Sequence, residues 1–425
     1  MSFALVALLL AAAPAQFQPP NTIVVVGEQI ADAREGLRTC LSRRCPPNED
    51  IDATLRLAET QLLAGKYRDA RKTLLESLGR NKDHARAYPI PVSDLYRANG
   101  KVAAHLGFDK DYYNSTWGIY RTLKFGLPSA DQRRLTAMME VAEMMFRTRG
   151  HTRARIYYDR VAKEARKVGR PDVAAIAELR SAVRHLPPNS SIQLQEIRRI
   201  AGMDGKSMRA PVIEAKMALA RIAYQKGDEA EAARQQRELA NLNIRRPMLI
   251  YSPSYSMVQQ EVDSGSEFGF PFAPPPGVGG DSSEGGGGPT AGPASPGGGD
   301  PGGIQSSNRV SMTSILALSQ WSTLKRIAGN FEDMWIDVGF RITEEGRVAD
   351  PQILRSKGDL FWAAPLMASI RGRRYTAGKL NASSYRRERY TYTSGYEGQT
   401  GTRVSQRSPK ARVEYVDLSD ISAPD

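Results

Sequence analysis

The chain has few of the residues on which metal and nucleophilic chemistry depend. Its 425 residues include four histidines and two cysteines. His84, His105, His151 and His185 are far apart, and none has another histidine three or four positions away. No HExxH, CxxC or GxSxG motif occurs, and no glycine run leads into the Lys-Ser/Thr of a phosphate-binding loop. We therefore predict no catalytic residue, no metal site and no cofactor, and we expect that the protein is not an enzyme.

Long apolar runs are also missing, except at the N-terminus. Residues 3–15 read FALVALLLAAAPA, which is shorter than the roughly 20 apolar residues that span a bilayer. The run ends in Ala13-Pro14-Ala15, a small-x-small pattern typical of signal-peptide cleavage, although no Lys or Arg precedes it. The sequence predicts a signal peptide over residues 1–15, export to the periplasm, and no membrane-spanning segment after cleavage.

The two cysteines, Cys40 and Cys45, lie close together in CLSRRC. An oxidising compartment favours one small intramolecular disulfide between them. Two free thiols remain an alternative, and so does a metal or redox site, which would need two further ligands.

The chain is strongly basic, with 59 Lys and Arg against 46 Asp and Glu and a formal net charge of +13. Such a charge favours acidic surfaces, although many exported bacterial proteins are simply basic. The densest basic run is RGRRYTAGKLNASSYRRERYTYT. Its end, Tyr385 to Thr393, alternates as a strand does, and we expect no nucleic-acid partner.

Residues 51–246 have the periodicity of paired helices, with breaks about 40 residues apart. The breaks fall at Gly65, Gly107, Gly150, Pro187-Pro188 and Gly227. The Gly-x-Tyr-x-x-Ala spacing at residues 65–70 resembles the turn of a tetratricopeptide (TPR) repeat. The resemblance implies an α-solenoid with a concave groove that binds peptides or proteins. Residues 16–50 are expected to be an extended N-terminal segment.

Aromatic residues concentrate in the second predicted helix pair. They are Tyr96, Tyr112, Tyr113, Trp117 and Tyr120. Aromatics at helical spacing usually belong to a core, and a ligand-binding groove is the alternative.

Residues 263–308 are rich in Gly, Pro and Ser. This composition cannot bury enough apolar surface to fold, so it predicts a disordered linker. An amphipathic helix is predicted to follow, from Ser314 to Phe331.

The C-terminal part alternates apolar and other residues at every second position from Ile336 to Ile342, which predicts a strand with one buried face. A turn at Glu345-Gly346 leads to a second strand, which Pro351 makes irregular or places at a sheet edge. A helix over residues 360–372 and a third strand, Tyr385 to Ser394, complete a ββαβ unit over residues 314–394. The tail, 395–425, holds one alternating stretch that favours a further strand, at Val413, Tyr415, Val416 and Leu418.

This unit resembles the C-terminal domain of TonB, the energy transducer of Gram-negative envelopes. The matching stretches are Val338–Ile342, Gly346-Arg347-Val348, Ile353–Ser356, Gly358 and Arg373–Ala377. The resemblance implies that an extended peptide is added to the open edge of the last strand. Because this strand is the final one of the unit, we expect its exposed edge to bind the partner through Tyr385, Arg387, Arg389, Tyr390 and Tyr392. Separately, Ile23–Val26 resembles the segment near the mature N-terminus of TonB-dependent outer-membrane receptors.

The predicted architecture is multidomain, with a TPR-like α-solenoid followed by a small α+β, TonB-like domain. The predicted function is a non-enzymatic periplasmic protein that binds a protein or extended peptide by strand addition and through its groove. Receptor N-terminal segments are the partners that the resemblance implies, in TonB-linked outer-membrane transport. The alternative is a TPR scaffold of the cell envelope with no transport role.

Overall fold

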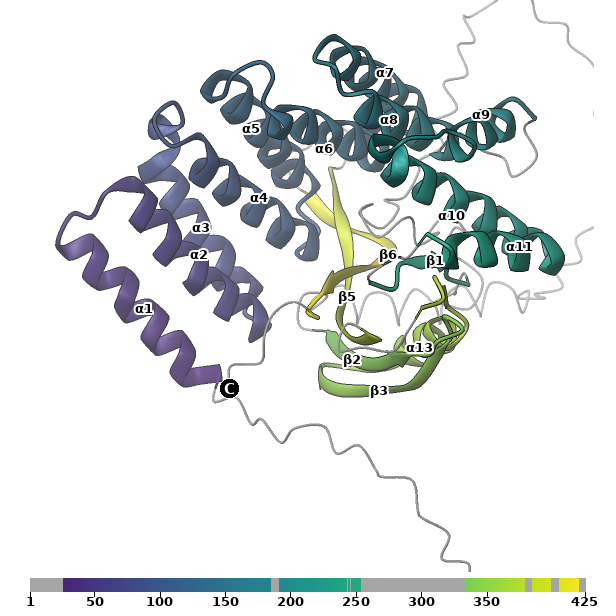
Figure 1. Ribbon diagram of the computed structural model, residues 1–425. Helices are drawn as coiled ribbons and strands as arrows, with labels where there is room; N and C mark the ends of the chain where they lie inside the picture. Colours follow the sequence, from purple (N-terminus) through teal and green to yellow (C-terminus); the bar gives the residue numbers. More distant parts are fainter. Residues whose placement is uncertain are drawn as a thin grey trace, which may run out of the picture.

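A computed structural model describes residues 26–184, 191–242, 244, 246–253, 334–378, 384–398 and 405–419. The chain forms a long helical region followed by a small antiparallel sheet (Figure 1). The helices are α1 (Val26–Ser42), α2 (Pro47–Leu63), α3 (Tyr67–Asn81), α4 (Pro89–His105), α5 (Asp109–Gly126), α6 (Gln132–Arg149), α7 (His151–Lys167), α8 (Pro171–Arg184), α9 (Ser191–Ala201), α10 (Arg209–Lys226), α11 (Glu229–Ala240) and α13 (Ala363–Arg371). Among these helices, none is long and apolar enough to cross a membrane.

The helical region consists of stacked helix pairs, as predicted. Four of the predicted breaks are turns between paired helices: Gly65, Gly107, Gly150 and Gly227 all have φ between 72° and 80°. Glycine reaches this left-handed region without the steric cost that a Cβ brings. The fifth break, Pro187-Pro188, lies outside the described residues. Successive pairs pack on one another, and their buried faces form a continuous series of apolar clusters.

The prediction of an extended segment over residues 16–50 is wrong for the described part, because helix α1 begins at Val26. Ile30 and Cys40 are buried, and Ala33 and Leu37 are half-buried. Their spacing of three or four residues puts them on one face of a helix, which packs on α2. The helical region is therefore one helix longer than the sequence predicted. The candidate signal peptide, the Ile23–Val25 stretch, the linker and the Ser314–Phe331 segment lie outside the described residues.

The C-terminal sheet has four antiparallel strands in the order β3-β2-β5-β6. Its strands are β2 (Trp335–Ile342), β3 (Val348–Lys357), β5 (Tyr385–Gly398) and β6 (Ser405–Asp417). The predicted turn joins β2 to β3, where Gly346 has a φ of 75° and donates its N–H to the Thr343 carbonyl at 2.9 Å. Pro351 lies in β3, which is an edge strand as predicted, and the β2–β3 register shifts twice.

Helix α13 covers one face of the sheet. Trp362, Leu366 and Ile370 are fully buried against Phe340 of β2 and its neighbours. A second, two-stranded sheet pairs β1 (Leu249–Tyr251), which follows the last helix pair, with β4 (Arg374–Tyr375). The end of the helical region thus hydrogen-bonds directly to the C-terminal unit.

The predicted boundary at residue 394 is too early. Strand β5 continues to Gly398, and the expected extra strand is β6, which pairs with β5 from Glu388 to Gly398. In Figure 1 the helices form an arc from α1 to α11, and the strands lie inside it. Contacts from the first and the last helix pairs reach the same C-terminal unit. The chain packs as a curved helical array around its own C-terminal sheet.

Candidate functional site

A cavity of about 400 Å³ opens between helices α4, α6 and α8, with α5 behind it. We call it the groove cavity. Helices α4, α6 and α8 are the first helices of three successive pairs, so the cavity belongs to the groove of the helical array. Its floor is apolar and is formed by Ile119, Leu135, Met139, Val173 and Ile176.

The rim of the groove cavity is charged, and most of its charges are paired within the chain. Arg97 donates Nε to Glu140 at 3.0 Å, and Arg180 lies 3.4 Å from both Glu143 and Glu214. Arg184, next to the rim, adds a 2.5 Å bond to Glu143. These ion pairs hold the shape of the rim, and the exposed Lys101 adds a positive charge to it.

Tyr112 closes the back of the groove cavity. Burial raises the pKa of its phenol to about 12, so this side chain is neutral in the ordinary pH range. The Arg147 guanidinium lies over its ring, 4.9 Å from the centroid. The cavity therefore combines an apolar floor, one aromatic wall and a rim of ion pairs with one exposed lysine.

The C-terminal sheet occupies the neighbouring part of the helical array, at the turns between paired helices. The Thr391 hydroxyl of β5 lies 2.8 Å from the Tyr67 hydroxyl and 3.0 Å from Nδ1 of His105. All three side chains are buried. Burial lowers the pKa of His105 to about 4, so the imidazole is neutral at this contact.

A buried ion pair fixes β2 and β5 to the end of α2. Arg389 donates Nε to Asp337 at 2.6 Å, and both side chains are fully buried. The same guanidinium donates to the carbonyl oxygens of Leu62 and Leu63, at 2.6 and 2.8 Å. These carbonyls lie in the last turn of helix α2, where a cation is favoured; the Leu62 carbonyl also accepts the Gly65 N–H at 2.8 Å.

Trp335 of β2 lies directly against the first glycine turn. A Cβ on Gly65 would fall 2.3 Å from Nε1 of Trp335, so only glycine allows this approach. Arg389 lies over the indole ring, 4.0 Å from its centroid. The glycine thus serves both the turn geometry and the packing of the sheet.

Further buried charges join β6 to the middle of the array. Arg147 of α6 donates to Glu414 of β6 at 3.1 Å, and both side chains are almost fully buried. Arg412 of β6 donates to Asp109, at the start of α5, at 2.7 Å. The sheet is therefore held by three successive helix pairs.

The predicted partner-binding edge is wrong, because β5 is an interior strand. It pairs with β2 on one side and with β6 on the other. The five residues proposed for that edge are buried or half-buried: Tyr385, Arg387, Arg389, Tyr390 and Tyr392. The tail of the chain itself supplies the strand that was expected from a partner.

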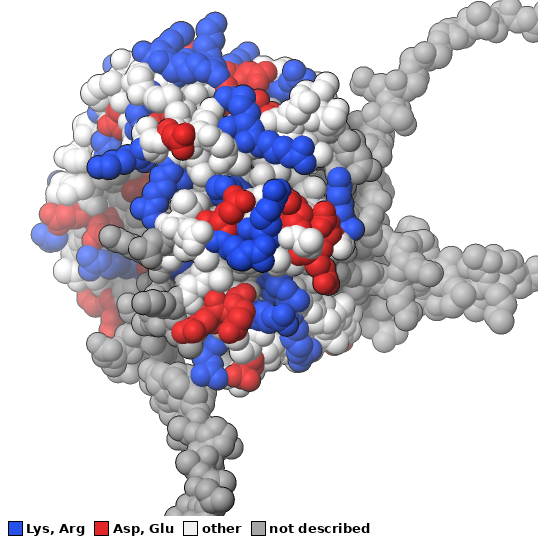
Figure 2. Space-filling model, turned by 45° about the vertical axis from the view of Figure 1, so that its right-hand side comes forward, with Lys and Arg blue, Asp and Glu red and all other residues white. Residues whose placement is uncertain are grey.

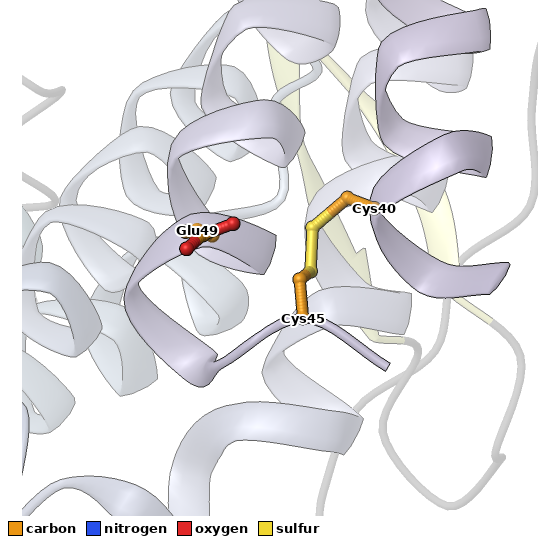
Figure 3. Close-up of side chains that lie close together, drawn as sticks. All are labelled: Cys40, Cys45 and Glu49. Atoms are coloured by element: carbon orange, nitrogen blue, oxygen red, sulfur yellow. A yellow bond between two sulfur atoms is a disulfide. The ribbon is translucent and has the colours of Figure 1, made fainter. Parts of the chain in front are cut away.

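Cys40 and Cys45 form a disulfide between the end of α1 and the connection to α2 (Figure 3). Glu49 lies beside it in the first turn of α2, with its carboxylate within 4.8 Å of both sulfur atoms. Sulfur atoms joined in a disulfide are not the thiolates that bind metals, and Glu49 forms an ion pair with Arg43. The geometry therefore favours a covalent link over a metal centre.

No local pattern in the sequence predicts the groove cavity, because its lining comes from four helices. Of the aromatic residues noted in the second helix pair, only Tyr112 lines it. The remaining ones pack partly against the core clusters and are half-exposed. The helical repeat in the sequence predicts a groove, but it does not predict where along the groove a cavity lies.

Together, the stacked pairs and glycine turns define a TPR-like helical-repeat protein with a C-terminal antiparallel sheet. The chain is similar to BtubC (BKLC) from P. vanneervenii, at 16% identity over 56% of this chain and 98% of that one, with a TM-score of 0.39. It is also similar to a Podosopora anserina protein described as kinesin light chain with TPR-like repeats, at 13% identity over 46% and 95% of the two chains, with a TM-score of 0.36. A third is the Rap conjugation gene regulator of plasmid pLS20 in complex with the Phr* peptide, at 14% identity over 52% and 62%, with a TM-score of 0.30.

These likenesses are distant, and the repeat fold of this chain rests on its own helix packing. No protein-family model matches the sequence. No curated protein matches it either.

Proposed function

We propose that this protein is a non-enzymatic interaction scaffold of the cell envelope that binds a protein or peptide partner in the groove cavity. The observation that carries the proposal is the cavity itself: an apolar pocket of about 400 Å³ between the first helices of three successive pairs. Helical arrays bind extended segments along such grooves.

The lining indicates what part of a partner the cavity would hold. Ligand pockets are mostly apolar with a few placed polar groups, and the floor, with Leu135 and Met139 at its centre, fits that description. Most of the rim's charge is paired within the chain, as in the Arg97–Glu140 pair, and the exposed Lys101 adds one positive charge. We therefore expect the partner to insert one large aliphatic or aromatic side chain as its anchor, since such residues dominate binding energy in desolvated pockets.

A non-enzymatic role is proposed because the cavity's carboxylates, Glu140 and Glu143, are engaged in ion pairs with arginines, and neither histidine nor cysteine is among its lining residues. His84, His105 and His151 lie in different helix pairs, and none of them lines it. A location in the envelope is supported by the disulfide, since such bonds persist in oxidising compartments. The apolar run over residues 3–15 supports the same location.

A second candidate is the TonB-like role, in which the C-terminal sheet takes up an extended receptor segment by strand addition. The order of elements β2, β3, α13 and β5 agrees with it. The sheet has two edge strands, β3 and β6. Strand β6 is bound to the helical array through Glu414 and Arg412, and in β3 Pro351 lacks an N–H and Asp350 has a φ of 49°. Both features weaken pairing at an edge, so we favour the groove over strand addition.

The test is peptide selection on the full chain followed by affinity measurement. Peptides that bind the immobilised protein are selected from a random library, and the affinity of each enriched peptide is measured by fluorescence anisotropy. We expect peptides with a shared apolar anchor residue. Thr136, an exposed residue at the mouth of the groove cavity, is replaced by Trp to block entry, and we expect at least a roughly tenfold loss of affinity.

The matched control is Thr152→Trp, the same change at an exposed position of α7 away from the cavity. It should leave the affinity within about twofold. Peptides that bind Thr136→Trp as tightly as the unmodified chain would overturn the groove proposal. Enrichment of segments like Ile23–Val26, insensitive to Thr136→Trp, would support the TonB-like candidate instead.

A further inference from the structure

Aromatic side chains line the outer face of α5 and the adjacent part of α7. Trp117 is at the centre, with ring centroids 6.4 Å from Tyr113, 5.7 Å from Tyr120 and 5.9 Å from Tyr157. All four rings are half-exposed. Phe125, further along α5, is 69% exposed, the largest exposure of any aromatic side chain noted on the described surface.

Each of these rings has a cation beside it. Arg149 lies 5.6 Å from the ring of Tyr113, Arg121 lies 5.9 Å from that of Trp117, and Arg160 lies 5.1 Å from that of Tyr157. Lys124 lies between Tyr120 and Phe125, at 5.5 and 5.4 Å. We call the five rings and these four cations the aromatic–basic face.

The four cations of the aromatic–basic face differ from the arginines of this chain that are held in ion pairs. Many exposed arginines are neutralised by a neighbour, as Arg38 is by Glu35 and Arg56 is by Asp52. Within the described part of the chain, Arg121, Lys124, Arg149 and Arg160 form no ion pair with a carboxylate. Their charge is therefore available to an anionic partner.

The aromatic–basic face lies apart from the surfaces described above. The C-terminal sheet reaches this helix pair only near its turn, as at His105 and Asp109, and the groove cavity is entered between α4, α6 and α8. Helix α7 is at the top of Figure 1. Figure 2 shows Lys and Arg side chains at the top of the molecule, with acidic side chains among them.

The arrangement of rings and cations indicates the kind of partner. Because the cations lie over the rings, the ring faces are not free to stack on bases or sugars. Cations and ring edges remain accessible, with an apolar tip at Phe125. Tyr and Trp side chains combined with Lys and Arg are the chemistry of the membrane–water interface, where the rings enter the headgroup layer and the cations meet phosphates.

We propose that the aromatic–basic face is a docking surface for an anionic lipid bilayer. Arg121, Lys124, Arg149 and Arg160 contact headgroup phosphates, and Phe125 and Trp117 enter the interfacial layer. The protein binds such a surface peripherally and reversibly, because five rings and four cations are far weaker than a spanning helix.

The test is co-sedimentation of the full chain with vesicles. Phosphatidylcholine vesicles containing about 30% phosphatidylglycerol are compared with pure phosphatidylcholine. We expect binding to the anionic vesicles only, weakening strongly as salt rises to about 0.5 M. Arg121→Glu with Lys124→Glu should reduce the vesicle affinity at least about tenfold, and Phe125→Ser alone should reduce it about threefold.

The control carries the same charge change elsewhere. Lys72→Glu with Lys82→Glu alters two exposed lysines near α3, and should cost no more than about twofold. Equal losses in the two double variants would show that net charge alone acts, and would overturn the proposal. Retention of an acidic polysaccharide or single-stranded DNA in the absence of vesicle binding would overturn it as well. Thr136→Trp should leave vesicle binding unchanged, so this test does not depend on the groove.

Discussion

Asp337 is the residue whose replacement best tests how the sheet is held in the helical array. Its carboxylate is fully buried and accepts hydrogen bonds from Arg389 at 2.6 and 3.0 Å and from Arg355 at 2.6 and 2.9 Å. Asp337→Asn removes the charge and keeps the shape. The buried Arg389 would then lack its anion, and breaking a buried pair in this way costs about 3–5 kcal/mol.

The assay is urea unfolding of the full chain, followed by circular dichroism and by tryptophan fluorescence. We expect Asp337→Asn to lower the unfolding midpoint by an amount equivalent to about 3 kcal/mol. Arg56→Ala is the control, because its pair with Asp52 is exposed and such pairs contribute about 0–1 kcal/mol. The double variant Asp337→Leu with Arg389→Met should recover part of the loss, since it removes both buried charges together. A loss below about 1 kcal/mol for Asp337→Asn would refute the account of the docking.

Three further predictions concern the same interface and the N-terminal helices. Gly65→Ala should destabilise the protein by at least about 1 kcal/mol more than Gly169→Ala in thermal unfolding. Both glycines have a φ near 70°, but only at Gly65 would the added Cβ meet Trp335. Burial lowers the pKa of His105 to about 4, against about 6.5 in the unfolded chain. The free energy of unfolding should therefore be highest above pH 6.5 and fall by up to about 3 kcal/mol as the pH drops toward 4. In urea titrations at several pH values, His105→Gln should make the free energy of unfolding less dependent on pH. Reducing the disulfide should lower the free energy of unfolding by about 2 kcal/mol, measured with and without dithiothreitol.

The glycine turns and strand alternation made much of the fold predictable. Gly65 and Gly107 marked the helix turns, and alternation from Ile336 to Ile342 marked β2, because both signals are local in sequence. Helix α1 was missed even though Ile30 and Cys40 are spaced for one helix face. The β-branched run just before this helix favoured the prediction of an extended segment.

The position of β5 in the sheet was not predictable in the same way. A strand's neighbours are decided by contacts far along the chain, and the resemblance to the TonB domain led to an open edge beside β5. The alternating tail at Val413 and Tyr415 was recognised as strand-forming, but its pairing with β5 was not foreseen. Arg389 was noted as an edge residue, and it is instead a buried cation that binds Asp337 and the end of α2.

The groove cavity lay beyond sequence reasoning for a related reason. Its floor joins residues from α5, α6 and α8, which are separated by tens of residues. The helical periodicity predicts that Ile119 and Leu135 face inward, and they do. It does not predict that a space remains between these residues and Val173. Only the packing of three successive pairs against one another leaves that opening.

Hydrogen exchange of the full chain, with and without a peptide selected on it, tests the central claim most directly. The account predicts slower exchange at the mouth of the groove cavity, in α6 over residues 132–143 and in α8 over residues 171–180, and no change in the Thr136→Trp variant. Slower exchange along β3, with α6 and α8 unaffected, would contradict it and would show that the partner adds a strand to the sheet.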